Sequence, residues 1–283
     1  MNRTLPVARR HPIAATFGLP DFLPSFAVLW QRRELLWSMT GRNIRSQYKQ
    51  SILGYAWIFV NPLMQMLVLT FVFSTILRIG SDVIPYPFPL FLFVALLPWM
   101  FFSNALSSAT ESISGSASLV TKVYFPREIL VTAAVFSKIV DLLFGLLILL
   151  GLMVFYNEYP SWTAVWVPAI FAIQLLFTIG LALPLAALNL FFHDVRYLVG
   201  VVLLVWFYIT PVIYPVEMVP HRYKILFDLN PLSLVLNAYR RVLLDGTSPG
   251  WDRMLLGIAG AFLAFLLGYY LFKRMEAGFA DRI

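Results

Sequence analysis

Long runs of uncharged, mostly apolar residues divide this chain of 283 residues. Positions 50–77, 83–110 and 197–216 carry no charged side chain. An α-helix rises ~1.5 Å per residue, so about 20 such residues cross the ~30 Å hydrocarbon core of a bilayer. Charged residues make up only 12% of the chain, against about 25% in a typical soluble domain. The sequence therefore predicts an all-α integral membrane protein with one membrane domain.

Six transmembrane helices account for the apolar runs, and a re-entrant, outward-facing helical hairpin is expected before the last of them. Residues 211–253 are too polar and too rich in proline for one straight span. Within this stretch Asn230-Pro231 is typical of a helix start and Gly246 of a helix stop. The expected spans are 50–77, a segment within 90–112, 131–156, a segment within 162–192, 197–216 and 254–272. The predicted layout is an amino-terminal extension (1–25), an amphipathic interfacial helix (26–49), a six-span domain (50–275) and a tail (276–283).

Polar residues inside the predicted spans allow two interpretations. Lys138 and Asp141 are three residues apart, so they share a helix face, and a local ion pair near the interface explains them better than a functional site. The second span carries a face of small and polar residues, which permits close helix packing or borders a polar path. We favour packing. The residues of this face are Ser103, Asn104, Ser107, Ser108, Ser112, Ser114 and Ser116.

Residues 26–49 have the periodicity of an amphipathic helix. Trp30 and Trp37 fall on the apolar side, and basic residues fall on the other side. Such a helix is suited to the headgroup layer of a membrane, so we expect it to lie on the bilayer rather than cross it.

The short segment 119–130 is a polar island between two predicted spans. Pro126 cannot continue a helix without losing a backbone hydrogen bond, so the chain should turn there. Lys122, Arg127 and Glu128 would face water, while Val123, Tyr124 and Phe125 would form an apolar contact face. The segment is either a docking knob for another protein or an ordinary interhelical loop.

The distribution of lysine and arginine between the two sides of the predicted spans indicates how the chain is oriented in the membrane. With six spans, and leaving out Lys138 because it lies within a span, 14 of these residues fall on the side that holds both termini and the island, and 6 fall on the other side. The richer side is expected to be cytoplasmic. Because the basic residues flank apolar runs, the net charge of +7 indicates contact with membrane lipid and not with nucleic acid.

Catalytic motifs are not apparent in the sequence. There is no Gly-x-x-x-x-Gly-Lys-Ser/Thr phosphate loop, no cysteine, and no His-Glu-x-x-His or Gly-x-Ser-x-Gly arrangement. We therefore expect no enzyme activity, metal or cofactor in this chain. Two other classes stay open, a secondary transporter and a membrane glycosyltransferase or ligase acting on a lipid-linked sugar. The second would need the outward residues Glu217, His221, Arg222 and Asp228 to converge.

Several short motifs, in order along residues 25 to 275, resemble the membrane (permease) subunits of type-2 ABC exporters for polysaccharides and polyol phosphates, a family that includes O-antigen, capsule and teichoic acid exporters. His193 stands where that family usually has arginine. The motifs are Tyr48-Lys49-Gln50-Ser51, Leu53-Gly54, Trp57, Asn61-Pro62-Leu63, Lys122 to Glu128, Phe191 to Val195, Thr210 to Pro215 and Asn230-Pro231-Leu232.

The resemblance implies a division of labour between subunits. Two copies of this chain would pair with two copies of a separate ATPase subunit, which binds ATP and Mg, and the complex would export a lipid-linked polysaccharide across the bacterial inner membrane. The island becomes the ATPase-coupling element, formed by Lys122, Val123, Tyr124, Phe125, Pro126, Arg127 and Glu128. The amphipathic helix becomes a gate helix, with Trp30, Trp37, Arg42, Arg45, Tyr48 and Lys49 as its candidate residues.

Aromatic residues are candidates for a sugar path, because rings can make weak, repeated contacts with the C–H faces of sugars, as conduction requires. Tyr55, Phe59, Trp206 and Tyr214 neighbour the two proline-broken stretches that should border a polar path. Packing or an interfacial aromatic belt is the alternative for each. Arg240 and Arg241 are candidates for contact with a lipid-linked phosphate, with ordinary headgroup contact as their alternative.

Overall fold

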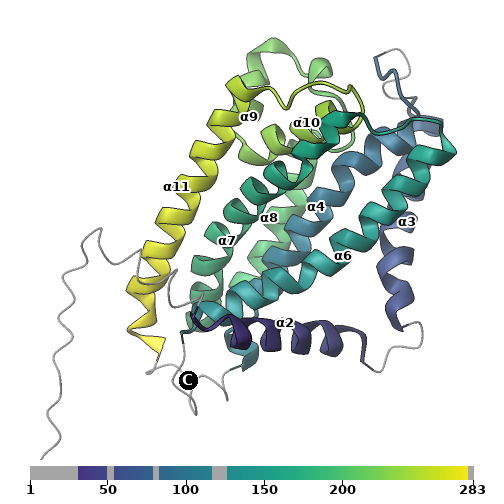
Figure 1. Cartoon of the computed structure of the whole chain (residues 1–283). Helices are drawn as coiled ribbons and strands as arrows, with labels where there is room; N and C mark the ends of the chain where they lie inside the picture. The colour runs from purple at the N-terminus through teal and green to yellow at the C-terminus, as the bar shows by residue number, and fades with distance from the viewer. Residues whose placement is uncertain (1–30, 50–53, 79–82, 117–125, 280–283) are drawn as a thin grey trace, which may run out of the picture.

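The computed structural model of the chain describes residues 31–49, 54–78, 83–116 and 126–279. In these residues it contains helices and no β-strand. The long helices form one bundle, and α2 lies across one end of it (Figure 1). The carboxyl-terminal end of α11 lies at the same end, which is called the α2 end below. The predicted all-α class is confirmed.

The long helices follow the predicted apolar runs. Five of the helices in the described residues are long and apolar enough to cross a membrane. In chain order the helices of the bundle are α2 (Arg33–Tyr48), α3 (Trp57–Thr70), α4 (Phe88–Thr110), α6 (Glu128–Phe155), α7 (Val167–Phe191), α8 (Val195–Ile209), α9 (Lys224–Asp228), α10 (Pro231–Leu243) and α11 (Trp251–Glu276). Short helical turns extend or connect them, namely η2 (Gly54–Ala56), η3 (Phe71–Ile76), η4 (Ser114–Ser116), η5 (Trp162–Trp166), η6 (Val216–Met218) and η7 (His221–Tyr223).

The fifth predicted span is shorter than expected. Residues 197–216 were expected to cross the membrane, but α8 ends at Ile209. The reason is Pro211, which disfavours helical geometry at the preceding residue, and Thr210 is indeed extended (ψ 139°). Fifteen helical residues cover about 22 Å, less than a ~30 Å core. A sixth span therefore stays a prediction.

Helix α4 is the centre of the bundle. It packs against α3, α6, α7, α8 and α10 and is buried along most of its length. The side chains of Leu90, Phe93 and Phe102 have no exposed surface. This burial explains why α4 lacks charged residues, since an unpaired charge among apolar helices is costly.

Helices α7 and α11 approach most closely at two glycines. A side chain at Gly268 would collide with the backbone carbonyl of Gly180, and one at Gly180 would collide with the backbone of Phe265. Small residues allow the two backbones to approach this closely. The resulting van der Waals packing is one of the main forces that hold membrane helices together. The two helices therefore form a tightly packed pair.

The predicted helix start and stop in the proline-rich segment are confirmed. The Asn230 side chain accepts a hydrogen bond from the Leu232 backbone N–H at 3.1 Å and so caps α10. Gly246 follows the helix with a left-handed φ of 62°, a conformation that suits glycine. Helix α10 packs among α4, α7 and α11, which fits a helix that dips into the bundle. A re-entrant path through a membrane stays a prediction.

Candidate functional site

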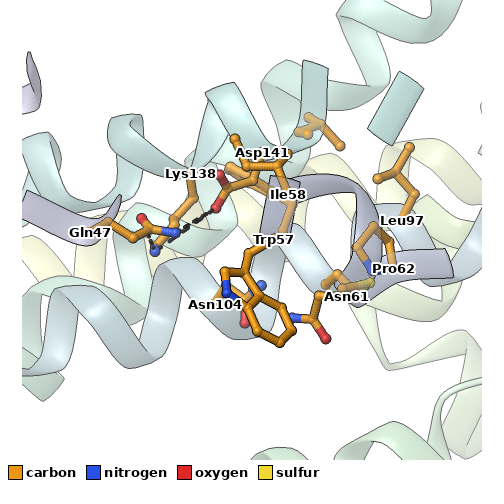
Figure 2. A pocket seen from close by; sticks show the side chains of 12 residues that line it. Gln47, Trp57, Ile58, Asn61, Pro62, Leu97, Asn104, Lys138 and Asp141 are labelled. Carbon is orange, nitrogen blue, oxygen red and sulfur yellow. Dashed lines mark hydrogen bonds and ion pairs between the residues drawn. The ribbon is translucent and has the colours of Figure 1, made fainter. Parts of the chain in front are cut away.

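Two adjoining cavities near the α2 end share Gln47 and Lys138 in their linings. The first has a volume of about 200 Å³ and lies between α2, α3, α4 and α6 (Figure 2). The second has a volume of about 530 Å³ and lies between α2, the end of α4 and α6. One water needs only about 10–15 Å³ of such space, so both cavities admit several waters or a polar group of a ligand.

Three polar side chains form a bridge beside the first cavity. The Lys138 ammonium donates a hydrogen bond to Gln47 Oε1 at 2.7 Å, and Gln47 Nε2 donates to Asp141 Oδ2 at 3.4 Å. Lys138 also pairs with Asp141 at 3.9 Å. Figure 2 shows the three side chains pointing toward one another from α2 and α6. The ion pair expected from the sequence is confirmed, and it additionally holds α2 to α6.

An apolar contact supports the same junction. Leu36 of α2 packs with Ile129 and Ala133 of α6, and all three are buried. Leu35 and Met39 of α2 pack against the same cluster, while Trp37, expected on that face, is 62% exposed and contacts the ring of Phe136 of α6, with ring centroids 6.2 Å apart. An exposed tryptophan on a helix across the bundle end fits the predicted interfacial position.

The polar face of α4 borders the cavities. Asn104 lines the first cavity, and Ser108, Ser112 and Ser116 line the second. Close helix packing was the favoured expectation for this face. For these four residues that expectation is wrong, because α2 spans the bundle end and leaves space beneath it.

One candidate gate residue, Arg42, lines the second cavity. Its guanidinium lies 3.5 Å from the Ser116 hydroxyl. Arg45 instead donates to the Gly41 carbonyl of its own helix at 3.2 Å. Lys49 is exposed directly after α2, and Tyr48 is the last residue of α2. Trp30 lies outside the described residues.

The coupling candidates are only partly described. Lys122, Val123, Tyr124 and Phe125 lie outside the described residues, and Pro126 lies two residues before the start of α6. Glu128 was expected to face water, but it is only 3% exposed because Lys273 of α11 covers its carboxylate. The expectation that Glu128 faces a partner is therefore wrong.

The four path candidates occupy two different helices and their ends. Tyr55 and Phe59, at the start of the α3 segment, are 55% and 37% exposed. Trp206 of α8 packs edge-on against Phe102 of α4, with ring centroids 5.3 Å apart. The Tyr214 hydroxyl donates to the Tyr208 carbonyl at 2.9 Å and closes the turn after α8. None of the four lines the two cavities, but α3 and α8 both pack on α4.

Arg240 is a structural residue. It is 6% exposed, and its guanidinium donates to the carbonyls of Pro211 at 2.7 Å and Val212 at 2.6 Å. It also lies 3.8 Å above the ring of Phe91, a cation–π contact. The expected contact with a lipid phosphate is therefore wrong for Arg240. Arg241 donates an exposed hydrogen bond to the Ser248 carbonyl at 3.0 Å, and it remains a candidate for contact with a lipid phosphate.

The residues required by the enzyme alternative are not gathered around one cavity. Glu217 lines a cavity of about 160 Å³ with Tyr86, Arg240 and Asp245, whereas His221, Arg222 and Asp228 do not line it. Burial and a hydrogen bond to Asp245 raise the pKa of Tyr86 to about 12, so it stays a neutral donor. Within the described residues, no group of three or more His, Cys, Asp or Glu side chains is placed to hold a metal ion.

Comparison with known proteins gives consistent results. The chain is 32% identical over 257 residues to the O-antigen export system permease protein RfbA of Myxococcus xanthus, covering 90% of this chain and 97% of the relative. It is 28% identical over 249 residues to the RfbA protein of Klebsiella pneumoniae, covering 88% and 94%. It is 20% identical over 207 residues to the polysialic acid transport protein KpsM of Escherichia coli, covering 72% and 79%.

The model of one protein family matches most of the chain. The match runs through residues 34–244, from the first turn of α2 to the end of α10, and the family is described as ABC-2 type transporter. The matched region contains both cavities and the bridge between α2 and α6. Together with the five helices able to span a membrane, this match identifies the chain as a multi-pass membrane protein of the ABC-2 type transporter family.

Proposed function

We propose that this chain is the transmembrane subunit of an ABC exporter that moves a lipid-linked polysaccharide, of the O-antigen or capsule type, across the bacterial cytoplasmic membrane. The observation that carries the proposal is the similarity to an O-antigen export permease along 90% of this chain and 97% of the relative. The sequence has no phosphate loop, so ATP hydrolysis would come from a separate subunit. Two copies of that ATPase, with its ATP and Mg, would bind two copies of this chain.

The cavities beneath α2 suit the entrance of such an exporter. Arg42, Lys138 and the hydroxyls of Ser108, Ser112 and Ser116 meet there beside Glu111. Two cations and several hydroxyls against one carboxylate suit the phosphate and hydroxyl groups of a lipid-linked glycan. Helix α2 covers this space, so its displacement would open it. We assign α2 the role of a gate, with Arg42 at the entrance and Trp37 anchored in the headgroup layer.

The exposed faces of α3 and α8 suit contact with lipid and with a second copy of the chain. Leu67 and Phe71 of the first span are 55% and 60% exposed, and Val201 and Val205 of α8 are 61% and 53% exposed. A homodimer would place these faces around a common path, with Tyr55, Phe59, Trp206 and Tyr214 along it. Arg241 would contact a lipid phosphate at the far end.

The orientation follows from the distribution of basic residues. The α2 end and both termini would be cytoplasmic, because 14 lysines and arginines are assigned to that side and 6 to the other. The ATPase would then meet the island before α6, with Lys122, Val123, Tyr124 and Phe125 as the contacts. A reporter inserted after Thr247 should be reached from outside, and one fused after Ile283 should not.

Genetic complementation tests the proposal. A strain that lacks this chain should lose its surface polysaccharide and accumulate lipid-linked glycan inside, and expression of the chain should restore export. An ABC ATPase should co-purify with the tagged chain. Normal surface polysaccharide in the deletion strain, or turnover of a lipid-linked sugar by the purified chain alone, would contradict the proposal.

A further inference from the structure

The first turn of α6 is joined to the last turn of α11 by a pair of opposite charges. The Lys273 ammonium donates to both carboxylate oxygens of Glu128, at 3.0 and 3.1 Å. It also pairs with Glu276, one turn further along α11, at 2.9 Å. The side chains of Lys273 and Glu128 are 20% and 4% exposed. These residues are 145 positions apart in sequence, so the contact joins the island to the end of the chain.

A second attachment lies beside the first. Arg127 donates a hydrogen bond to the backbone carbonyl of Glu276 at 2.9 Å, and its guanidinium lies 5.2 Å from the centroid of the Phe279 ring. Phe279 has no exposed surface and packs against Phe272 of α11 and Phe191 of α7. The described residues after α11 are thus fixed between α6 and α7 and are not a free tail.

Helix polarity favours this arrangement. Glu128 is the first residue of α6 and Lys273 lies in the last turn of α11. A carboxylate is stabilised at a helix amino terminus and an ammonium at a carboxyl terminus, because the terminal N–H and C=O groups carry partial charges of the opposite sign. Each charge therefore lies at the helix end that stabilises it, and removal of Lys273 leaves the buried Glu128 carboxylate without its partner.

Rigid packing extends the connection beyond α11. Gly180 and Gly268 leave no space between α7 and α11 for a side chain. A displacement of the end of α11 must therefore move α7 or break this packing. The start of α6 is thus linked to the end of α11 by the ion pair, and α11 to α7 by close backbone packing.

We propose that Lys273, through its ion pair with Glu128, is a positioning residue for energy coupling. The pair holds the last span to the first turn of α6, so that movement imposed on the island by the ATPase passes to α11 and α7. In this arrangement the buried Glu128 does not contact the ATPase. Glu128 and the half-buried Arg127 transmit the movement, while the residues before Pro126 receive it. This inference rests on the proposed function, which supplies the ATPase.

Charge substitutions in the complex of chain and ATPase test the inference. Lys273→Met and Glu128→Gln should each lower export per ATP hydrolysed by about fivefold or more, the lower end of typical coupling energies between sites. Lys273→Arg should retain at least part of the coupling, because it keeps the positive charge opposite Glu128. Arg274→Met is the matched control, because Arg274 lies in the same turn and is exposed, and it should couple as the unaltered chain does.

A covalent link provides a second measurement. The chain has no cysteine, so Glu128→Cys with Lys273→Cys introduces the only two thiols of this subunit. The double variant should hydrolyse ATP with little export, and joining its thiols with a short bismaleimide should raise export again, since the link replaces the ion pair.

The inference is overturned if the single variants export at the unaltered rate per ATP hydrolysed, or if joining the thiols changes nothing. It is also overturned if export falls only in proportion to the amount of folded complex, which would indicate a purely structural ion pair. In each of these cases the deletion strain still reports separately on the proposed function.

Discussion

The ammonium of Lys138 lies 2.7 Å from Oε1 of Gln47 and thereby joins a membrane-spanning helix to the helix that crosses the end of the bundle. Lys138 keeps its charge close to Asp141, so the bridge needs no buried isolated ion. Only one neutral side chain of α2 takes part. The bridge can therefore open without leaving a charge unpaired, as the gate role proposed for α2 requires.

The bridge gives the first prediction. Replacing Gln47 with leucine, which is similar in volume, should shift the docking equilibrium of α2 by roughly tenfold, since a hydrogen bond to a charged group contributes about 1.5–3 kcal/mol. A cysteine placed at Ser137, which is buried and lines the second cavity, should then react faster with a water-soluble maleimide in permeabilised cells. Gln31→Leu, at an exposed position before α2, is the control. An unchanged labelling rate in Gln47→Leu would show that the bridge does not hold α2.

The glycine contact gives the second prediction. Gly268→Leu should destabilise the protein, because overpacking costs about 1–3 kcal/mol and the Gly180 backbone cannot move aside cheaply. Membrane abundance and the melting temperature in detergent should both fall. Gly151→Leu serves as the control, since no atom lies within 4 Å of a Cβ at that position. Equal stability of the two variants would contradict the close approach of α7 and α11.

Arg240 gives the third prediction. Arg240→Met should lower the free energy of unfolding by about 2–4 kcal/mol, because two buried carbonyls lose their donor and each unsatisfied group costs about 1–3 kcal/mol. Lysine should not rescue it, since a single ammonium cannot replace the planar guanidinium above Phe91. Thermal unfolding in detergent provides the measurement. Arg241→Met, on a half-buried side chain whose hydrogen bond to Ser248 is exposed, should change stability much less, by about 0.5 kcal/mol. Similar losses for both variants would contradict the structural role of Arg240.

The features predicted correctly from the sequence depend on residues that are close together along the chain. Asn230 and Gly246 carry local signals for a helix start and stop, and the spacing of Lys138 and Asp141 places them on one helix face. The end of α8 at Ile209 could also have been predicted, because Pro211 restricts the backbone of Thr210. It was missed because the run of uncharged residues continues past this point to residue 216.

Features that depend on distant segments could not be predicted from one sequence. Gln47 and Lys138 are 91 residues apart, and Glu128 and Lys273 are 145 apart, with no local pattern to pair them. Glu128 was placed in water because its neighbours in sequence are polar, whereas its burial depends on α11. The burial of Arg240 likewise depends on a distant segment, because only the fold brings the carbonyls of Pro211 and Val212 to its guanidinium. From the sequence alone it was therefore placed at the membrane interface.

The aromatic candidates give the fourth prediction. Alanine at Tyr55, Phe59, Trp206 or Tyr214 should reduce export in at least two of the four cases while ATP hydrolysis continues, because each would remove a weak contact along the sugar path. Surface glycan per amount of membrane protein is the measurement. Trp206→Ala should also lower stability, since its ring packs on Phe102, whereas Tyr55 is largely exposed and should tolerate the change. If export falls only in proportion to the amount of protein in the membrane, the four aromatic residues have a structural role and do not line a sugar path.

The most direct test is transport by the purified complex. The chain and its co-purifying ATPase are reconstituted in vesicles that carry a lipid-linked polysaccharide on the ATPase side, and a lectin detects glycan on the opposite side. The fifth prediction is that glycan appears there only with ATP and Mg and only when both subunits are present. Movement of the glycan by the chain without the ATPase, or no movement with ATP hydrolysis intact in a complex that carries the authentic glycan, would contradict the account.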